Sequence, residues 1–191
     1  MFEKILYKMG FKEMDIIIIE LIEEQDLIQN EKFLYDSFVK KMPDEWIIEN
    51  YMIIDNCRLK PLFPYSDLKV FDIRVNNNTL INMILNMNKK NLQLEKIGFT
   101  RENIKNEKNF CEGITFCSKG VPADLGPDFI LLFQKINELI LNKLKEYHIE
   151  VVYGTCALFV KRFYERIGFK AIASINKGQK DEEFLLEMEI K

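Results

Sequence analysis

A long amphipathic segment in the second half of the chain leaves few architectures open to it. From Asp128 to Tyr147 the apolar residues recur at helical spacing for about five turns. Asp128 is a suitable N-cap, because its carboxylate can accept hydrogen bonds from the free N–H groups at a helix start. Short apolar segments at 110–116 and 149–153 flank this helix and predict two strands. A strand, a helix and a strand in succession favour a mixed α/β domain.

The rest of the sequence extends this pattern on both sides. Residues 158–167 predict a short amphipathic helix, which Gly168 ends in the left-handed conformation. The other expected strands are 15–22, 68–75, 79–87, 169–175 and 183–190. The other expected helices are 24–41 and 92–99, and a helix is the alternative for 79–87. Residues 45–55 fit a strand or a partial helix, and loops are predicted at 59–65, 101–107 and 118–127.

Composition indicates one compact domain spanning residues 1–191. Of the 191 residues, 48% are hydrophobic and 12% aromatic, which is enough for a buried core. The 27 lysines and arginines against 30 acidic residues give a formal charge of -3, so nucleic acid is not an expected partner. The sequence shows neither a signal-peptide pattern nor an apolar run near the ~20 residues that span a bilayer. We therefore expect a soluble, cytoplasmic protein with no membrane partner.

The cysteines and the single histidine argue against a metal site. Cys57, Cys111, Cys117 and Cys156 form no C-x-x-C pair, so we expect neither a zinc site nor a disulfide. His148 stands at the end of a predicted helix, where it suits the helix dipole. A Cys–His nucleophilic pair is the alternative. No metal is expected.

A motif runs from the short helix into the strand after it. Residues 162–169 read Arg-Phe-Tyr-Glu-Arg-Ile-Gly-Phe and follow the predicted strand at 149–153. This order resembles the GNAT superfamily of acyl-CoA-dependent N-acyltransferases, in which a Tyr-Glu-Lys-x-Gly-Phe segment ends a helix and opens a strand. The resemblance covers residues 110–190. The same phrase also resembles the branch of acyl-homoserine-lactone synthases and N-acyl amino acid synthases.

The resemblance implies a fold and a reaction. The fold is a mixed, mostly antiparallel sheet flanked by helices, with a V-shaped split between two central parallel strands, here 110–116 and 149–153. The reaction moves an acyl group from a thioester in that split to an amine. The implied donor is acetyl-CoA, a longer acyl-CoA or an acyl carrier protein thioester. The implied acceptor is a small-molecule amine, and a homodimer is left open.

The resemblance also implies roles for residues around the split. Tyr164 matches the tyrosine that protonates the departing thiolate, which suits a phenol of pKa ~10. A packed aromatic is the alternative for Tyr164. The residues that would meet the thioester arm at the end of the first strand are Phe116, Cys117 and Ser118. The residues that would receive the pyrophosphate at the helix start, where free N–H groups favour negative charge, are Gly126, Asp128 and Phe129.

The phosphate-binding loop departs from the family pattern. Leu125 stands at its Arg/Gln position, and Asp128 and Ile130 stand at its two glycines, so only Gly126 agrees. The Asp128 carboxylate would repel a diphosphate by about 1 kcal/mol at ~4 Å in water and roughly 4 at an effective dielectric of 20. Ala157 replaces the family's helix-start asparagine and is placed at the same cofactor site. These departures leave open a catalytically degenerate binding module, and an unrelated α/β domain is a third alternative.

Glu112 is the predicted general base, because an amine nucleophile has to lose a proton. It lies on the strand expected to face the split, beside apolar neighbours that would raise its pKa. A solvent-facing glutamate is the alternative. Cys156 could accept an acyl group, but a buried structural cysteine is favoured. Glu187 is expected on the outward face of the last strand.

Overall fold

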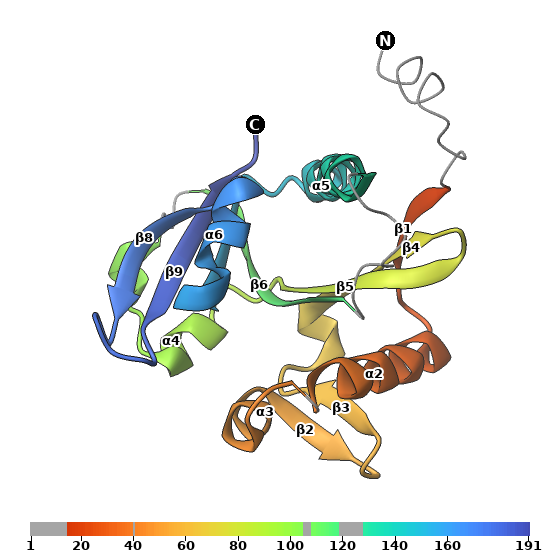
Figure 1. Cartoon of the computed structure of the whole chain (residues 1–191), viewed down its shortest axis with the longest axis horizontal. Coiled ribbons are helices and arrows are strands. Elements are labelled where there is room, and N and C mark those ends of the chain that lie inside the picture. Colours follow the sequence, from red (N-terminus) through yellow and green to blue (C-terminus); the bar gives the residue numbers. More distant parts are fainter. Residues whose placement is uncertain (1–14, 40, 105–107, 119–127) are drawn as a thin grey trace.

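A seven-stranded sheet forms the centre of the molecule, with helices on both of its faces (Figure 1). The computed structural model describes residues 15–39, 41–104, 108–118 and 128–191. In spatial order the strands are β1 (Ile16–Glu20), β4 (Leu68–Val75), β5 (Asn78–Asn86), β6 (Phe110–Ser118), β7 (Val151–Ala157), β9 (Glu183–Glu189) and β8 (Lys170–Ile175). All neighbouring pairs in this sheet are antiparallel except β6 and β7, which are parallel. The predicted mixed, mostly antiparallel sheet is confirmed.

The two faces of the sheet carry different elements, and Figure 1 shows α2 and α5 on opposite sides of it. The first face is covered by α2 (Glu24–Phe38), α3 (Asp44–Asn50), α4 (Gln93–Ile97) and a ribbon of β2 (Tyr51–Ile54) and β3 (Arg58–Pro61). The second face is covered by α5 (Asp128–Glu146) and α6 (Leu158–Arg166). Single 3-10 turns lie at Tyr65–Asp67 and Arg101–Asn103. Among the described residues we find no helix that is both long enough and apolar enough to cross a membrane.

Apolar side chains on each face bind these layers together. The predicted stripe of α5 is confirmed, because four residues at helical spacing are buried against β4, β5 and β6: Leu132, Ile136, Ile140 and Leu144. On the first face α2 contributes Leu34, which is fully buried against the sheet and the ribbon. A third cluster packs α4 against the starts of β6 and β7. Both sides of the sheet near β6 are therefore held by packed helices.

The parallel strands β6 and β7 are paired only at their starts. Their register begins with Phe110 opposite Val151 and ends with Gly113 opposite Gly154. Farther along, β6 remains paired with β5 on its other side, and β7 remains paired with β9. The two strands thus separate after four paired residues, and the predicted V-shaped split is present between them.

Several expectations about individual elements are corrected. The loop expected at 59–65 contains β3, and Pro61 is tolerated there because a two-stranded ribbon leaves each strand a free edge. The strand expected to end at residue 153 runs on to Ala157. Glu187 does not face outward: it is 8% exposed, and the Tyr153 hydroxyl donates a hydrogen bond to it at 3.2 Å.

Other elements agree closely with the sequence. The ambiguous segment at 45–55 holds both a helix, α3, and a strand, β2. The segment at 79–87 is a strand, and β8 and β9 pair as expected. Gly168 has a φ of 110°, so it follows α6 in the left-handed region as predicted. The loop predicted at 118–127 lies, from residue 119 on, outside the described residues.

Candidate functional site

The split between β6 and β7 narrows to a floor made by two glycines. Gly113 and Gly154 lie opposite each other as the last paired residues of these strands. A Cβ on Gly154 would stand 3.4 Å from the carbonyl oxygen of Gly113, at the short end of ordinary contact. The absence of side chains therefore lets the two main chains meet closely at this point. A ligand could enter only beyond it.

Beyond the floor, the edges of β6 and β7 that face each other form no ladder in the described residues. The register of β5 and β6 shifts between Ile84 and Leu85, which places a bulge in β6 at Ile114. A bulge bends its strand and strengthens the local twist, which accounts for the separation of β6 from β7. Exposed strand edges bind an extended ligand through main-chain hydrogen bonds. An arm that carries amide groups is thus a suitable guest.

Tyr164 stands beside this split on the second face of the sheet. It belongs to α6, which begins directly where β7 ends. Its ring meets the rings of Phe116, Phe163 and Phe169 at centroid distances of 6.5, 5.6 and 5.7 Å. Burial, together with the nearby thiols of Cys156 and Cys117, raises the pKa of Tyr164 to about 12. The phenol therefore stays protonated at neutral pH and is available as a proton donor.

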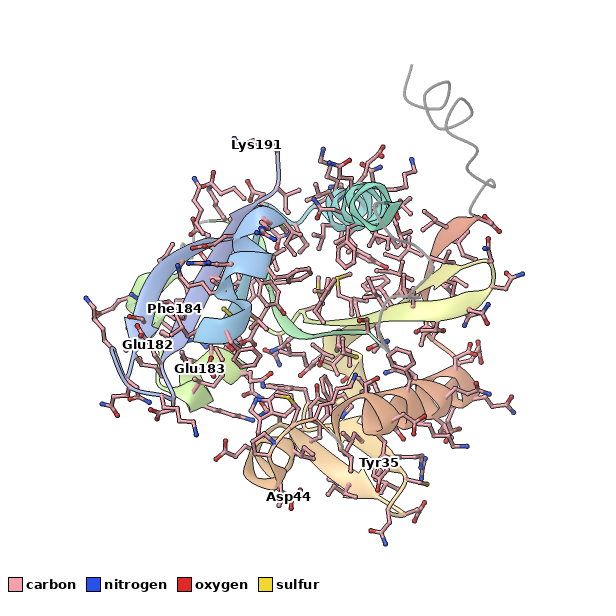
Figure 2. All side chains as sticks on the ribbon, in the orientation of Figure 1. Tyr35, Asp44, Glu182, Glu183, Phe184 and Lys191 are labelled. Atoms are coloured by element: carbon pink, nitrogen blue, oxygen red, sulfur yellow. The ribbon has the colours of Figure 1, made fainter. Side chains whose placement is uncertain are left out.

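The position of α6 is fixed by contacts on two sides. The ring of Phe163 meets that of Phe133 on α5 edge-on at 5.6 Å. The ammonium of Lys161 lies 5.1 Å from the centre of the Phe184 ring. Figure 2 shows Phe184 beside α6, at the start of β9. These contacts hold Tyr164 in place at the edge of the split.

The structure places Glu112 on the opposite face from Tyr164, under the first turn of α4. Its Oε1 accepts a hydrogen bond from the backbone N–H of Leu94 at 2.6 Å. Its Oε2 accepts from the backbone N–H of Gln93 at 2.8 Å and from the side-chain amide of Asn86 at 3.1 Å. Burial raises the pKa of the Glu112 carboxyl, as the sequence predicts, although these three donors oppose the shift. The carboxylate is 2% exposed and is not solvent-facing.

A pair of hydroxyl groups near the split was not identified from the sequence. The Tyr51 hydroxyl lies 2.5 Å from Oγ1 of Thr115, and either atom can be the donor. Thr115 follows the bulge in β6, and Tyr51 begins the ribbon. The two residues are 64 positions apart in sequence, so no local pattern signals the contact.

The thiols near the split are buried, as the sequence favours. Cys111, Cys117 and Cys156 are at most 6% exposed, and all four cysteines of the chain are free. Burial raises the pKa of Cys117 to about 12 and that of Cys156 to about 11. Thiols with such pKa values are almost wholly protonated at neutral pH, so they are poor nucleophiles.

The structure brings only some of the predicted cofactor residues together. Phe116 packs against Tyr164, Cys117 is buried under α2, and Ser118 is the last residue of β6, paired with Ile81. Ala157 precedes α6 and supplies no side-chain cap to it. Gly126 lies outside the described residues. Of Asp128 and Phe129 only the helical backbone at the start of α5 is described.

Two further features bear on the chemistry of the site. A small apolar cavity lies between α5, α6 and β6, with a lining that consists of Phe116, Phe133, Ile136, Asn137, Ile140 and Ile167. In the part of the chain that is described, no group of three or more histidine, cysteine or acidic side chains is arranged to hold a metal ion.

Comparison with known proteins finds the same fold in solved acyltransferase structures. The AHL synthase LasI superposes with a TM-score of 0.62 at 14% identity, over 95% of this chain and 92% of LasI. FeeM, an N-acyl amino acid synthase from uncultured soil microbes, gives 0.56 at 14% identity, over 93% and 92%. A Bacillus subtilis acetyltransferase in complex with CoA gives 0.50 at 12% identity, over 93% and 100%. No family model and no curated protein matches the sequence. The resemblance to GNAT proteins is confirmed for the fold.

Proposed function

We propose that this protein is an N-acyltransferase that moves an acyl group from a thioester to an amine. The observation that carries the proposal is the split between β6 and β7 with Tyr164 beside it. The unladdered edges would hold the thioester arm, and holding both substrates in one cleft supplies much of the rate. An acyl-CoA or an acyl carrier protein thioester is the proposed donor.

The proposed reaction assigns a separate task to each group. The amine nitrogen attacks the thioester carbonyl carbon, a C–N bond forms and the C–S bond breaks. Tyr164 gives its proton to the departing sulfur and regains one afterwards. The amine loses a proton to a base, for which Glu112 stays our prediction. Because three donors occupy its carboxylate, Glu112 would act through an intervening water.

The acceptor is proposed to be a small amine. FeeM is described as an N-acyl amino acid synthase, so free amino acids are the first acceptor class to test. The second candidate function is a catalytically degenerate module that binds a small ligand or a protein. Ala157 favours this alternative, because it offers α6 no side-chain cap where the family has asparagine.

Ligand-dependent melting of the purified protein separates the two functions. A thioester present at 100 times its dissociation constant should add about 2.7 kcal/mol to the free energy of unfolding. We expect this shift with acetyl-CoA or a long-chain acyl-CoA, and release of free thiol when an amine is added. A protein that melts at the same temperature with every thioester would contradict the transferase proposal and favour the binding module.

A further inference from the structure

The hydroxyls of Tyr51 and Thr115 form a buried pair on the first face of the split. The two residues are 4% and 5% exposed, and their oxygens are 2.5 Å apart. Thr115 lies two residues beyond Gly113, the last residue of β6 that is paired with β7. The pair thus stands roughly 7 Å along the strand from the floor of the split, at ~3.3 Å per residue.

This pair has one more donor than it uses. Each hydroxyl carries one O–H, and the bond between them consumes only one of the two hydrogens. Within the described residues, neither hydroxyl makes another hydrogen bond. A buried O–H without an acceptor is costly. Whichever oxygen donates in the pair, one hydrogen is left for a third group.

Aromatic packing fixes the direction of the Tyr51 ring. Its centroid lies 5.7 Å from that of Phe38 and 5.8 Å from that of Trp46, and these two rings meet edge-on at 5.2 Å. The hydroxyl is therefore carried by a ring held on two sides, and the bulged strand β6 holds its partner Thr115. Such a donor needs little reorganisation when it meets a ligand.

The pair and Tyr164 approach the split from opposite faces. Phe116 directly follows Thr115, and its ring meets that of Tyr164 at 6.5 Å. Tyr164 is also close enough to contribute, after burial, to the raised pKa of Tyr51. Two protonated phenols therefore converge on the same opening. A thioester presents two heteroatoms on one carbon, a sulfur and a carbonyl oxygen.

We propose that the Tyr51–Thr115 pair donates its free hydroxyl hydrogen to the carbonyl oxygen of the acyl thioester. This inference rests on the proposed function. When the amine attacks, the carbonyl π electrons move onto this oxygen, and the hydrogen bond strengthens as the negative charge grows. When the C–S bond breaks, the electrons return to the carbonyl. The pair keeps both of its protons, and Tyr164 supplies the proton that the sulfur takes.

Binding of two CoA derivatives tests the hydrogen bond without catalysis. Acetyl-CoA carries the carbonyl oxygen, whereas S-ethyl-CoA has a methylene in its place. We expect the wild-type protein to bind acetyl-CoA about tenfold more tightly by calorimetry, and the variant Tyr51→Phe/Thr115→Val to lose about fivefold of this preference. Each single variant should lose less, because one hydroxyl remains to donate. The matched control is Tyr65→Phe, which removes a phenol that donates to Glu31 instead.

Turnover provides the second measurement. Loss of a donor to the developing oxyanion lowers kcat by roughly 10²–10³-fold, so the double variant should lose kcat with little change in the KM for the amine. Equal binding of acetyl-CoA and S-ethyl-CoA by the wild-type protein, or an unchanged preference in a double variant that still binds CoA, would overturn this inference and leave the transferase proposal standing. Failure of the wild-type protein to bind any thioester would overturn both.

Discussion

Replacing Glu112 with glutamine probes the link between α4 and the floor of the split. The substitution keeps the size of the side chain but replaces one acceptor oxygen with an NH₂ group. The carboxylate accepts from the N–H groups of Gln93 and Leu94 at 2.8 and 2.6 Å. The two N–H groups bond to different oxygens, so one of them must face the new NH₂ group. A buried donor left without an acceptor costs about 1–3 kcal/mol, and we expect a loss of this size in the free energy of unfolding.

The size of the loss should depend on pH. Burial raises the pKa of Glu112 in the folded state above the ordinary 4.5, so the folded protein holds this proton more tightly than the unfolded chain does. Wild-type stability from this group is therefore fully present below pH 4.5 and is lost as the pH rises through the folded pKa. The glutamine variant lacks this titration. The difference between the two proteins should thus be largest near pH 4 and smaller at pH 7.

Urea unfolding followed by fluorescence measures this difference. Trp46 is the single tryptophan and packs against Phe38 and Tyr51, so its emission reports the folded core. The matched control is Glu95→Gln on the exposed side of α4, where Arg101 lowers the pKa of the carboxyl. Its small contribution should have the opposite sign, being lost as the pH falls. If the deficit of the Glu112 variant grows between pH 4 and pH 7, the ionised carboxylate is the favoured form and our reasoning is wrong.

Three further substitutions test the site and the core. Tyr164→Phe should lower turnover by about 10²–10⁴-fold while acyl-CoA binding by calorimetry is retained; an unchanged rate would remove Tyr164 from the chemistry. Asp128→Gly should tighten CoA binding by roughly tenfold or more, because it removes a carboxylate from the expected phosphate site; weaker binding would refute that alignment. Leu34→Ala should cost about 2–5 kcal/mol in urea unfolding, because Leu34 is fully buried, and a loss below ~1 kcal/mol would contradict its place in the core.

Local patterns account for the parts of the fold that were predicted well. The stripe on α5 and the stop at Gly168 depend on neighbours within a few residues, so periodicity and glycine chemistry were sufficient. The split followed from the resemblance of residues 110–190, and the end of the pairing at Gly113 confirms it. The extra length of β7 was missed because residues 154–157 show too little apolar alternation to indicate a strand.

Long-range contacts account for what the sequence could not predict. The raised pKa of Glu112 was predicted, but its donors were not: they lie on β5 and α4, 18 to 26 residues away. Tyr51 was not identified because its partner Thr115 is 64 residues away and no motif joins the two. Glu187 was misassigned because alternation along a strand distinguishes its two faces but not how far a helix or a neighbouring strand covers each.

The contact between Gly113 and Gly154 acts as a depth stop for anything that slides between the two strands. Bare backbone meets bare backbone there, so the stop does not depend on the rotamer of any side chain. Mutations along the walls can reshape the chamber above while its lowest point keeps the same height. A methyl group at position 154 would work as a shim at this contact and would be expected to lift the resting place of the reactive carbon relative to the groups that must reach it.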